Sequence, residues 1–389
     1  MSSYQNQPVA FAHGVGAWLT DVNGQRYLDA LSGIAVCGLG HAHPAVTQAI
    51  AQQAGQLLHT SNLYHIPLQE KLADRLTALA GMDKVFFCNS GAEANEAAIK
   101  ITRLYARKKN IREPAIIVAD KGFHGRTLAT LSATGNDKVR EGFEPLVPGF
   151  VHVPYNRIDA ITSALKASAD IIAVMLEPIQ GEGGVVVPDK GYLRAVRDVC
   201  DENGLLFILD EVQTGMCRTG RWFAYQHEGM TPDIMTLAKA LGNGVPIGAC
   251  LARGVAAELI RPGKHGSTFG GNPLASRAAL AVLDVLEQQQ LDKRAAQLGK
   301  SMLDGFRAGL GNLKGVAEVR GLGMMFGIEL DRDCTGLVEM ALSQHLLINV
   351  TSGNIVRILP PLIINDAEAA QIVDMVCRLI RDFLARQAT

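Results

Sequence analysis

Hydrophobic residues follow two alternating patterns through the middle of the chain. Short runs that are apolar throughout occur at VFFC (85–88), AIIVA (115–119), IIAVML (171–176), LLFIL (205–209) and IMTLA (234–238). Between these runs, apolar residues recur at helical spacing, as in the stripes Val46, Ala49, Ile50, Ala54, Leu57, Leu58 and Ala97, Ala98, Ile101, Leu104, Tyr105. Continuous apolar strands that alternate with amphipathic helices predict an α/β fold with a mostly parallel central sheet, covered on both faces.

The two ends of the chain follow other patterns. AWLTDVNGQRYLDAL (17–31) predicts a hairpin around Asn23 and Gly24, because Asn-Gly favours the tight turns that join antiparallel strands. From about residue 275 onward helical segments dominate, with strands expected within 323–330 and 354–359. We therefore predict an N-terminal segment (1–48) that packs with a smaller C-terminal α+β domain (266–389), and a large domain (49–265) between them.

Composition narrows the classes of function. The 389 residues include 37 basic and 38 acidic side chains, without an evident basic block, which disfavours nucleic acid and anionic membrane as partners. Seven cysteines lie far apart, with no CxxC pair and no zinc-ligand spacing, as is typical of reduced cytosolic proteins. Neither a signal peptide nor an apolar stretch of about 18 residues is evident. These features predict a cytoplasmic globular protein.

Polar residues follow several of the apolar runs. Asp210 and Glu211 come directly after LLFIL, Glu177 after IIAVML, and Lys239 after IMTLA, while VFFC leads to Asn89, Ser90 and Gly91, where a helix is expected to begin. The carboxyl ends of parallel strands meet at one edge of a sheet, which is where ligands bind in such folds. The sequence therefore predicts a shared site that contains a lysine, a carboxylate and a helix N-terminus.

This combination matches the requirements of pyridoxal 5′-phosphate. Its aldehyde needs an amine, which Lys239 supplies, and its ring nitrogen needs a buried carboxylate, which Asp210 supplies. Its phosphate needs backbone N–H groups at a helix start, as at Ser90–Ala92. Each residue also has a simpler interpretation when taken alone: Asp210 as a metal ligand or turn residue, Ser90 as a helix cap and Lys239 as a side chain that extends to solvent.

Two nucleotide-binding alternatives and a metal site are disfavoured. LLFILDE has the form of the acidic strand of nucleotide hydrolases, but the only Gly-Lys-Ser, at 299–301, has Arg294 where the phosphate loop requires glycine. GLGMMFG (321–327) has one residue too many for the dinucleotide fingerprint. His41 and His43 have no evident third ligand, so we interpret them as turn and packing residues.

Six motifs occur in an order and spacing that resembles the class III, or subgroup II, aminotransferases, which are pyridoxal-phosphate enzymes of fold type I. They are NSGAEANEAA (89–98), FHGRT (123–127), EPIQGEGG (177–184), LDEVQTG (209–215), AKALGNG (238–244) and STFGGNPLA (267–275). The resemblance covers nearly the whole chain. It implies that Lys239 forms the Schiff base and moves the proton, and that Asp210 pairs with the ring nitrogen.

The same resemblance implies the other cofactor contacts. Val212 and Phe123 would pack on the two ring faces, and Gln213 would lie near the ring hydroxyl. Ser90, Gly91 and Ala92 would hold the phosphate together with Thr268 of the neighbouring subunit, which implies a homodimer with shared sites.

The implied reaction is transfer of the δ-amino group of N2-acetyl-L-ornithine to 2-oxoglutarate, a step of arginine biosynthesis. Arg126 resembles the arginine that binds the α-carboxylate of the acylated donor, and Arg357 the arginine that binds the α-carboxylate of glutamate or 2-oxoglutarate. Glu182 resembles the acid that masks this second arginine, and Ser267 is a further expected substrate contact.

Ile34 bears on the choice of substrate. Family members that act on free ornithine have a tyrosine at this position, and an aliphatic side chain suits an acylated, uncharged nitrogen better. Transaminases of N-succinylornithine, succinyl-diaminopimelate, ornithine or 4-aminobutyrate remain alternatives within the family. A racemase or aminomutase on the same scaffold and a metabolite-binding protein without catalysis are rivals of other classes.

Overall fold

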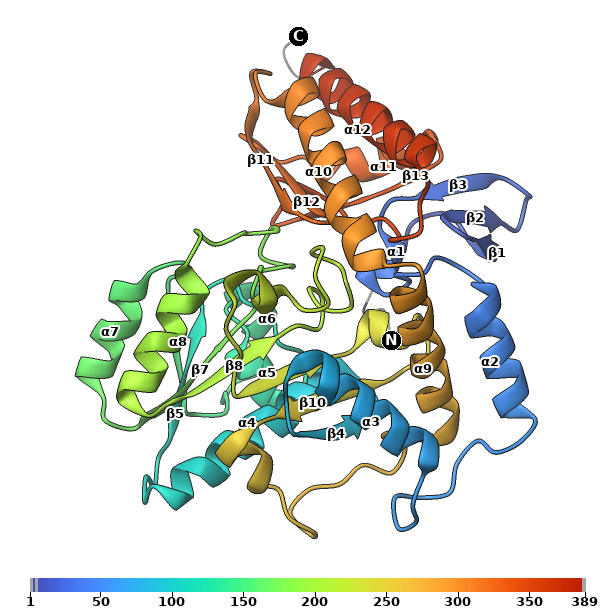
Figure 1. The fold of residues 1–389 in the computed structure, drawn as a ribbon. Coiled ribbons are helices and arrows are strands. Elements are labelled where there is room, and N and C mark those ends of the chain that lie inside the picture. The colour runs from blue at the N-terminus through green and yellow to red at the C-terminus, as the bar shows by residue number, and fades with distance from the viewer. Residues whose placement is uncertain (1–2, 4–5, 387–389) are drawn as a thin grey trace.

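The computed structural model describes residue 3 and residues 6–386. Its centre is a seven-stranded sheet in the order β4-β10-β9-β8-β7-β5-β6 (Figure 1). These strands are β4 (Lys84–Cys88), β10 (Gly248–Ala252), β9 (Ile234–Leu237), β8 (Leu206–Asp210), β7 (Ile171–Leu176), β5 (Ala115–Ala119) and β6 (Phe150–Val153). All are parallel except β10, which runs antiparallel to both of its neighbours. The predicted mostly parallel sheet is therefore confirmed, and each apolar run forms a strand.

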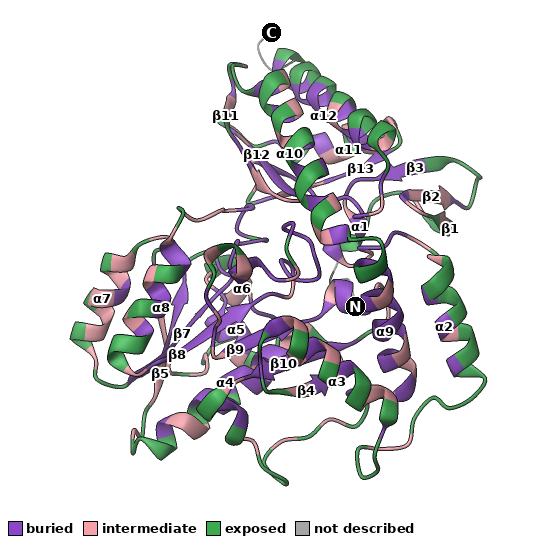
Figure 2. Cartoon of the chain, viewed as in Figure 1, coloured by how far each residue is buried: buried purple, intermediate pink, exposed green. Residues whose placement is uncertain are grey.

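Helices cover both faces of this sheet, and alternate residues of one strand pack against the helices on the two faces. In β8, Leu206 and Ile208 share a buried cluster with Ala97 of α4 (Gly91–Lys108), whereas Phe207 and Leu209 share another with Val196 of α8 (Tyr192–Asn203). The strand is buried along its whole length because both faces are covered (Figure 2). This explains why its sequence is apolar without alternation.

The remaining elements around the sheet are short or lie at its edges. They are the helices α2 (Pro44–Ala54), α3 (Pro67–Ala80), α5 (Leu128–Ala133), α6 (Asp137–Arg140), α7 (Ile158–Ala167) and α9 (Pro273–Gln288), and the 3₁₀ turns η1 (Ala224–Glu228), η2 (Lys239–Leu241) and η3 (Gly254–Glu258). The expected helical stripe up to Leu58 was wrong in its last turn. Helix α2 ends at Ala54, and Leu57 and Leu58 are exposed beyond it.

Two smaller sheets lie at the top of Figure 1. One joins β1 (Phe11–Val15), β2 (Trp18–Asp21) and β3 (Arg26–Asp29) to β13 (Leu346–Leu347). The other joins β11 (Val316–Leu322), β12 (Met325–Leu330), β15 (Ile355–Ile358) and β14 (Asn349–Thr351), near α10 (Leu291–Leu310), α11 (Leu337–Ser343) and α12 (Asp366–Arg386). The expected hairpin at Asn23 and Gly24 is confirmed as β2–β3. The division of the chain at residues 48 and 265 stays a prediction.

No helix within residue 3 and residues 6–386 is long and apolar enough to cross a membrane. All seven cysteines are free thiols, and all but Cys37 are buried. Burial raises the pKa of Cys88 to about 12, so this thiol stays protonated at neutral pH. The six buried cysteines therefore act as small core residues.

Candidate active site

A cavity of about 710 Å³ lies where the carboxyl ends of the parallel strands meet. Its lining contains most of the residues that the sequence singled out, namely Ser90, Gly91, Ala92, Phe123, Arg126, Glu182, Asp210, Val212, Gln213 and Lys239. Ile34 also lines it, from the short turn α1 (Ser32–Ala35). Residues from six distant parts of the chain thus converge on one cavity.

Lys239 follows β9 and begins the turn η2 with a left-handed backbone (φ 42°). Such strain in a non-glycine residue is typical of functional positions. Burial, followed by repulsion from Arg357, lowers the pKa of Lys239 to about 8. A larger fraction of this amine is therefore neutral and nucleophilic near neutral pH than for an ordinary lysine.

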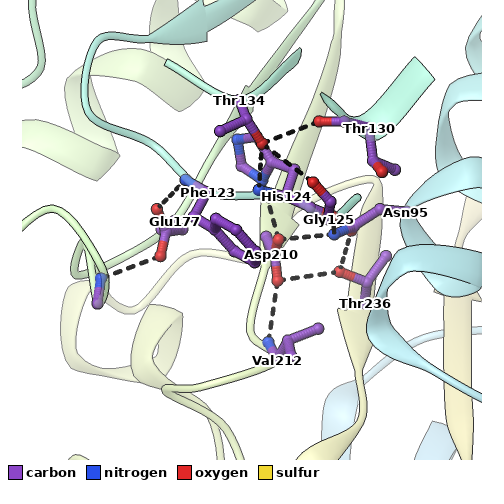
Figure 3. A network of polar contacts seen from close by, with 11 residues as sticks. Asn95, Phe123, His124, Gly125, Thr130, Thr134, Glu177, Asp210, Val212 and Thr236 are labelled. Carbon is purple, nitrogen blue, oxygen red and sulfur yellow. Dashed lines mark hydrogen bonds and ion pairs between the residues drawn. The ribbon is translucent and has the colours of Figure 1, made fainter. Parts of the chain in front are cut away.

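Asp210 ends β8 at the floor of the cavity, where it is 4% exposed. Its Oδ2 accepts hydrogen bonds from Asn95 Nδ2 (2.7 Å) and His124 Nδ1 (2.9 Å), and its Oδ1 accepts one from Val212 N (3.1 Å) (Figure 3). Thr236 Oγ1 lies 3.5 Å from Oδ1 and donates to Asn95 Oδ1 (2.7 Å). These hydrogen bonds fix the position of the carboxylate.

Asn95 and His124 were not predicted from the sequence as site residues. Both stand inside motifs that were singled out, but only the contacts with Asp210 give them a role. Burial by itself would lower the pKa of His124, yet the hydrogen bond and charge of Asp210, with the charge of Glu177, raise it overall. His124 therefore donates its Nδ1–H to the Asp210 carboxylate inside the buried network.

Glu177 lines the same cavity at the end of β7 and was noted only as a strand-end acid. Its carboxylate accepts hydrogen bonds from Phe123 N (2.9 Å) and Gly181 N (3.0 Å), which joins two loops of the site. Burial raises the pKa of Glu177 to about 7, while the charge of His124 acts in the opposite direction. The cavity therefore contains a carboxyl group that gains or loses its proton near neutral pH.

The start of α4 forms a small cradle beside Val212. Ser90 caps the helix by accepting a hydrogen bond from Glu93 N (3.2 Å). A Cβ added to Gly91 would lie 2.9 Å from Cγ1 and Cγ2 of Val212, so only glycine fits there. The free N–H groups of this first turn can bind an anion.

The two arginines that are predicted to bind substrate differ in their surroundings. Arg126 is exposed at the cavity and, within residues 6–386, has no ion pair or hydrogen bond, and its guanidinium lies 5.7 Å from the ring of Phe123. Arg357 is fully buried, and its Nε donates to Asn349 Oδ1 (3.0 Å). Its Nη1 lies 3.0 Å from Glu182 Oε2. Arg126 is therefore open to a carboxylate, whereas Arg357 already faces one.

Ser267 and Thr268 lie elsewhere. They line a separate hollow of about 460 Å³ on the other side of Asn89, which donates from Nδ2 to Ser267 Oγ (3.3 Å). Thr268 is exposed, as a contact with a neighbouring subunit would require. That contact stays a prediction. Ser267 does not reach the cavity of its own chain, so its place among the substrate contacts also stays a prediction.

Residues 1–380 match the family model of the class-III aminotransferases. The chain is a class-III aminotransferase. It is 56% identical over 384 residues to the acetylornithine aminotransferase of Nitrosomonas europaea, covering 99% of this chain and 98% of that protein. It is 48% identical over 382 residues to the protein of the same name from Methanothermobacter thermautotrophicus, covering 98% and 96%.

Solved structures of this family have the same fold. The ornithine aminotransferase of Toxoplasma gondii gives a TM-score of 0.95 at 36% identity, covering 99% of this chain and 93% of that one. The acetylornithine aminotransferase of Elizabethkingia anophelis gives 0.87 at 36% identity, covering 98% and 96%. The fold is therefore that of the fold type I pyridoxal-phosphate enzymes.

Class-III aminotransferases use pyridoxal phosphate, and the residues of this cavity fit it. The cradle at Gly91 suits the phosphate, the buried carboxylate of Asp210 suits a protonated ring nitrogen, and Lys239 would supply the amine. This class-III aminotransferase is thus a pyridoxal-phosphate-dependent transaminase.

Proposed function

We propose that this enzyme transfers the δ-amino group of N2-acetyl-L-ornithine to 2-oxoglutarate, giving N-acetyl-L-glutamate 5-semialdehyde and L-glutamate. This reaction is a step of arginine biosynthesis. The observation that carries the proposal is the pairing of an open arginine, Arg126, with a masked one, Arg357, in an enzyme whose relatives are named acetylornithine aminotransferases. N-acetylornithine reacts at its δ-amine and glutamate at its α-amine, so their α-carboxylates lie at different distances from the reacting atoms and suit two separate arginines.

When bound, pyridoxal phosphate supplies the electron sink that lets a proton leave the carbon next to the reacting amine. Lys239 takes that proton and returns it at the neighbouring position, and its lowered pKa suits it to act as the base near neutral pH. Asp210 keeps a proton on the ring nitrogen, while Asn95 and His124 hold its carboxylate in place. The amides at Ser90–Ala92 bind the phosphate, and Val212 and Phe123 exclude water from the ring faces.

The Arg357–Glu182 pair separates the two half-reactions. While the donor is bound through Arg126, its reacting end carries an amine and no carboxylate, so Arg357 is not needed and Glu182 neutralises it. When 2-oxoglutarate or glutamate binds, its α-carboxylate takes the place of Glu182 at Arg357. Glu182 is about half exposed, so its side chain has room to move away.

Ornithine is the second candidate donor, because ornithine aminotransferases have the same fold at 36% identity. Ile34 argues against it, since an aliphatic side chain offers no partner to a free α-ammonium group. N-succinylornithine, succinyl-diaminopimelate and 4-aminobutyrate remain further candidates because none of them requires a polar group at this position.

We also propose that the enzyme is a cytoplasmic homodimer whose subunits share their sites. Large apolar side chains are exposed at Leu63, Tyr64 and Phe269, where 87%, 70% and 59% of the respective residues is accessible. Asn62 Nδ2 donates to Ser267 O and Gly270 O (both 3.0 Å), which fixes these apolar residues near Thr268. An apolar face next to Thr268 suits a subunit interface through which Thr268 reaches the partner's cofactor.

The test is a half-reaction of the purified holoenzyme with single amines. N-acetylornithine, N-succinylornithine, ornithine or 4-aminobutyrate is added without a keto acid, and the cofactor's visible absorbance is followed. Rapid loss of the absorbance with N-acetylornithine, and recovery with 2-oxoglutarate, is the expected result. Faster reaction with another amine would reassign the substrate, and a protein that takes up no pyridoxal phosphate would overturn the proposal.

A further inference from the structure

Four consecutive residues beside the cavity have left-handed backbone conformations. Their φ angles are 48° at Ser32, 63° at Gly33, 65° at Ile34 and 61° at Ala35. Only glycine adopts this conformation readily, because Cβ of an L-residue comes too close to the next carbonyl oxygen. The other residues of this turn must therefore be held in place by their surroundings.

Asp29 and Ser32 provide the holding contacts. Asp29 Oδ1 accepts hydrogen bonds from Leu31 N (2.9 Å) and Ser32 N (2.8 Å), which are the amides that lead into the turn. Ser32 Oγ donates to Leu359 O (2.7 Å), which attaches the turn to the end of β15. Asp29 and Ser32 are 2% and 0% exposed, so water cannot replace these bonds.

The Asp29 carboxylate is itself held by His41, whose Nε2 lies 2.7 Å from Asp29 Oδ2. Arg218, which is buried at 1% exposure, donates from Nη1 to Met324 O (3.1 Å) and Pro360 O (2.5 Å), and burial lowers its pKa to about 10 while the charge of Asp29 acts in the opposite direction. His41 is thus the side chain that directly holds the Asp29 carboxylate. Loss of His41 or Asp29 would loosen the buried support of the turn.

The turn forms one wall of the cavity, because Gly33, Ile34 and Val36 line it together with Lys239 and Arg126. Asp29 and His41 do not line it. The position of the Ile34 side chain follows from the left-handed backbone that carries it. A right-handed backbone at the same residues would turn this side chain to another direction.

We infer that Asp29 and His41 are positioning residues for donor selectivity, which act by holding the left-handed turn so that Ile34 meets the acylated nitrogen of the donor. The inference rests on the proposed function, because it takes the donor to carry an uncharged acylamino group.

The inference is tested by a double-mutant cycle on the holoenzyme. The probe is N-acetylnorvaline, which has the carboxylate and acetamide of N-acetylornithine but no amine to react, and its dissociation constant is measured by calorimetry. Asp29→Ala is expected to weaken binding about tenfold in the wild-type background and less than about twofold in the Ile34→Ala background. Asp29→Asn keeps an acceptor for the two amides and is expected to restore most of the affinity.

A matched control removes the same kind of contact away from the cavity. Asp21 Oδ1 accepts from Asn23 N (2.9 Å) and Gln25 N (2.8 Å) in the β2–β3 hairpin, and Asp21→Ala should leave the dissociation constant unchanged. Equal weakening by Asp29→Ala in both backgrounds would overturn the inference, because a general structural defect acts independently of Ile34.

If Asp29→Ala does not fold, His41→Gln takes its place in the cycle. His41→Gln is then expected to weaken binding in the wild-type background and less in the Ile34→Ala background. Equal weakening in both backgrounds would again overturn the inference. A wild-type enzyme that binds N-acetylnorvaline no better than norvaline would overturn the proposed function and the inference together. Additive effects in an enzyme that does prefer the acetylated probe would overturn the inference alone.

Discussion

The cofactor end and the substrate end of the cavity are built in different ways. At the cofactor end, Asp210 and Lys239 extend directly from neighbouring parallel strands, and the carboxylate of Asp210 is fully hydrogen-bonded. At the substrate end, Glu182 belongs to a loop and Ile34 to a strained turn, and Arg357, which is buried beside Glu182 and does not line the cavity, belongs to another sheet. In the proposed mechanism, the chemistry depends on the rigid centre of the fold, whereas selectivity depends on contacts between separate parts of the chain.

The largest effect is expected at the cofactor end from Lys239→Ala. Without the amine, no group moves the proton, so turnover should fall by more than about a thousandfold while pyridoxal phosphate still binds noncovalently. The measurement is steady-state transamination together with cofactor content. Lys300→Ala on the outer face of α10, where Lys300 pairs with Asp304, is the control and should keep full activity. Near-normal turnover by Lys239→Ala would refute the role of the lysine.

A smaller effect is expected from Asp210→Asn. The amide keeps part of the hydrogen bonding with Asn95 and His124 but carries no charge to hold the proton on the ring nitrogen. We expect kcat to fall about a hundredfold or more, with little change in KM for the donor. Stopped-flow measurement of the half-reaction separates these constants. If kcat/KM fell by the same factor but only because KM rose, Asp210 would contribute to binding rather than to chemistry.

The smallest effect is expected from His41→Gln, near the substrate end, and concerns the stability of the folded protein and how that stability depends on pH. Hydrogen bonds with Asp29 and then Cys37 raise the pKa of His41 to about 9, against the effect of burial. Because this pKa is raised in the folded state, the stabilisation is complete below the ordinary histidine pKa of about 6.5 and is lost as the pH rises through about 9. His41→Gln should therefore lower the melting temperature by about 2 °C or more at pH 6 and hardly at pH 10. A difference that grows with pH would contradict this account.

The sequence predicted the cofactor end more completely than the substrate end. Apolar runs that end in Asp210 and Lys239 are local patterns, and parallel strands bring such ends together regardless of loop details. The contacts of Asp210 with Asn95 and His124 join residues far apart in the chain, so no local pattern indicates them. Strand β10 was missed as well, and its antiparallel direction fits the short connection from β9 (residues 238–247), because parallel neighbours need a longer crossover.

The turn at residues 32–35 shows most clearly what could not be predicted from the sequence. Its sequence, Ser-Gly-Ile-Ala, contains one glycine and favours no left-handed conformation, which comes instead from Asp29, His41 and the carbonyl of Leu359. The end of helix α2 was misjudged for a related reason, because Leu57 and Leu58 continue the helical pattern but lie exposed. Their exposure fits the proposed subunit interface, which the sequence of a single chain does not reveal.

The proposed division of labour between the two arginines is best tested by measuring each half-reaction in Arg126→Ala and Arg357→Ala. Arg126→Ala is expected to slow the reaction with N-acetylornithine by about a hundredfold and to affect the reaction with L-glutamate less, and Arg357→Ala is expected to do the reverse. Equal losses in both half-reactions for both variants would contradict this division of labour, because a single shared carboxylate site would then explain the data.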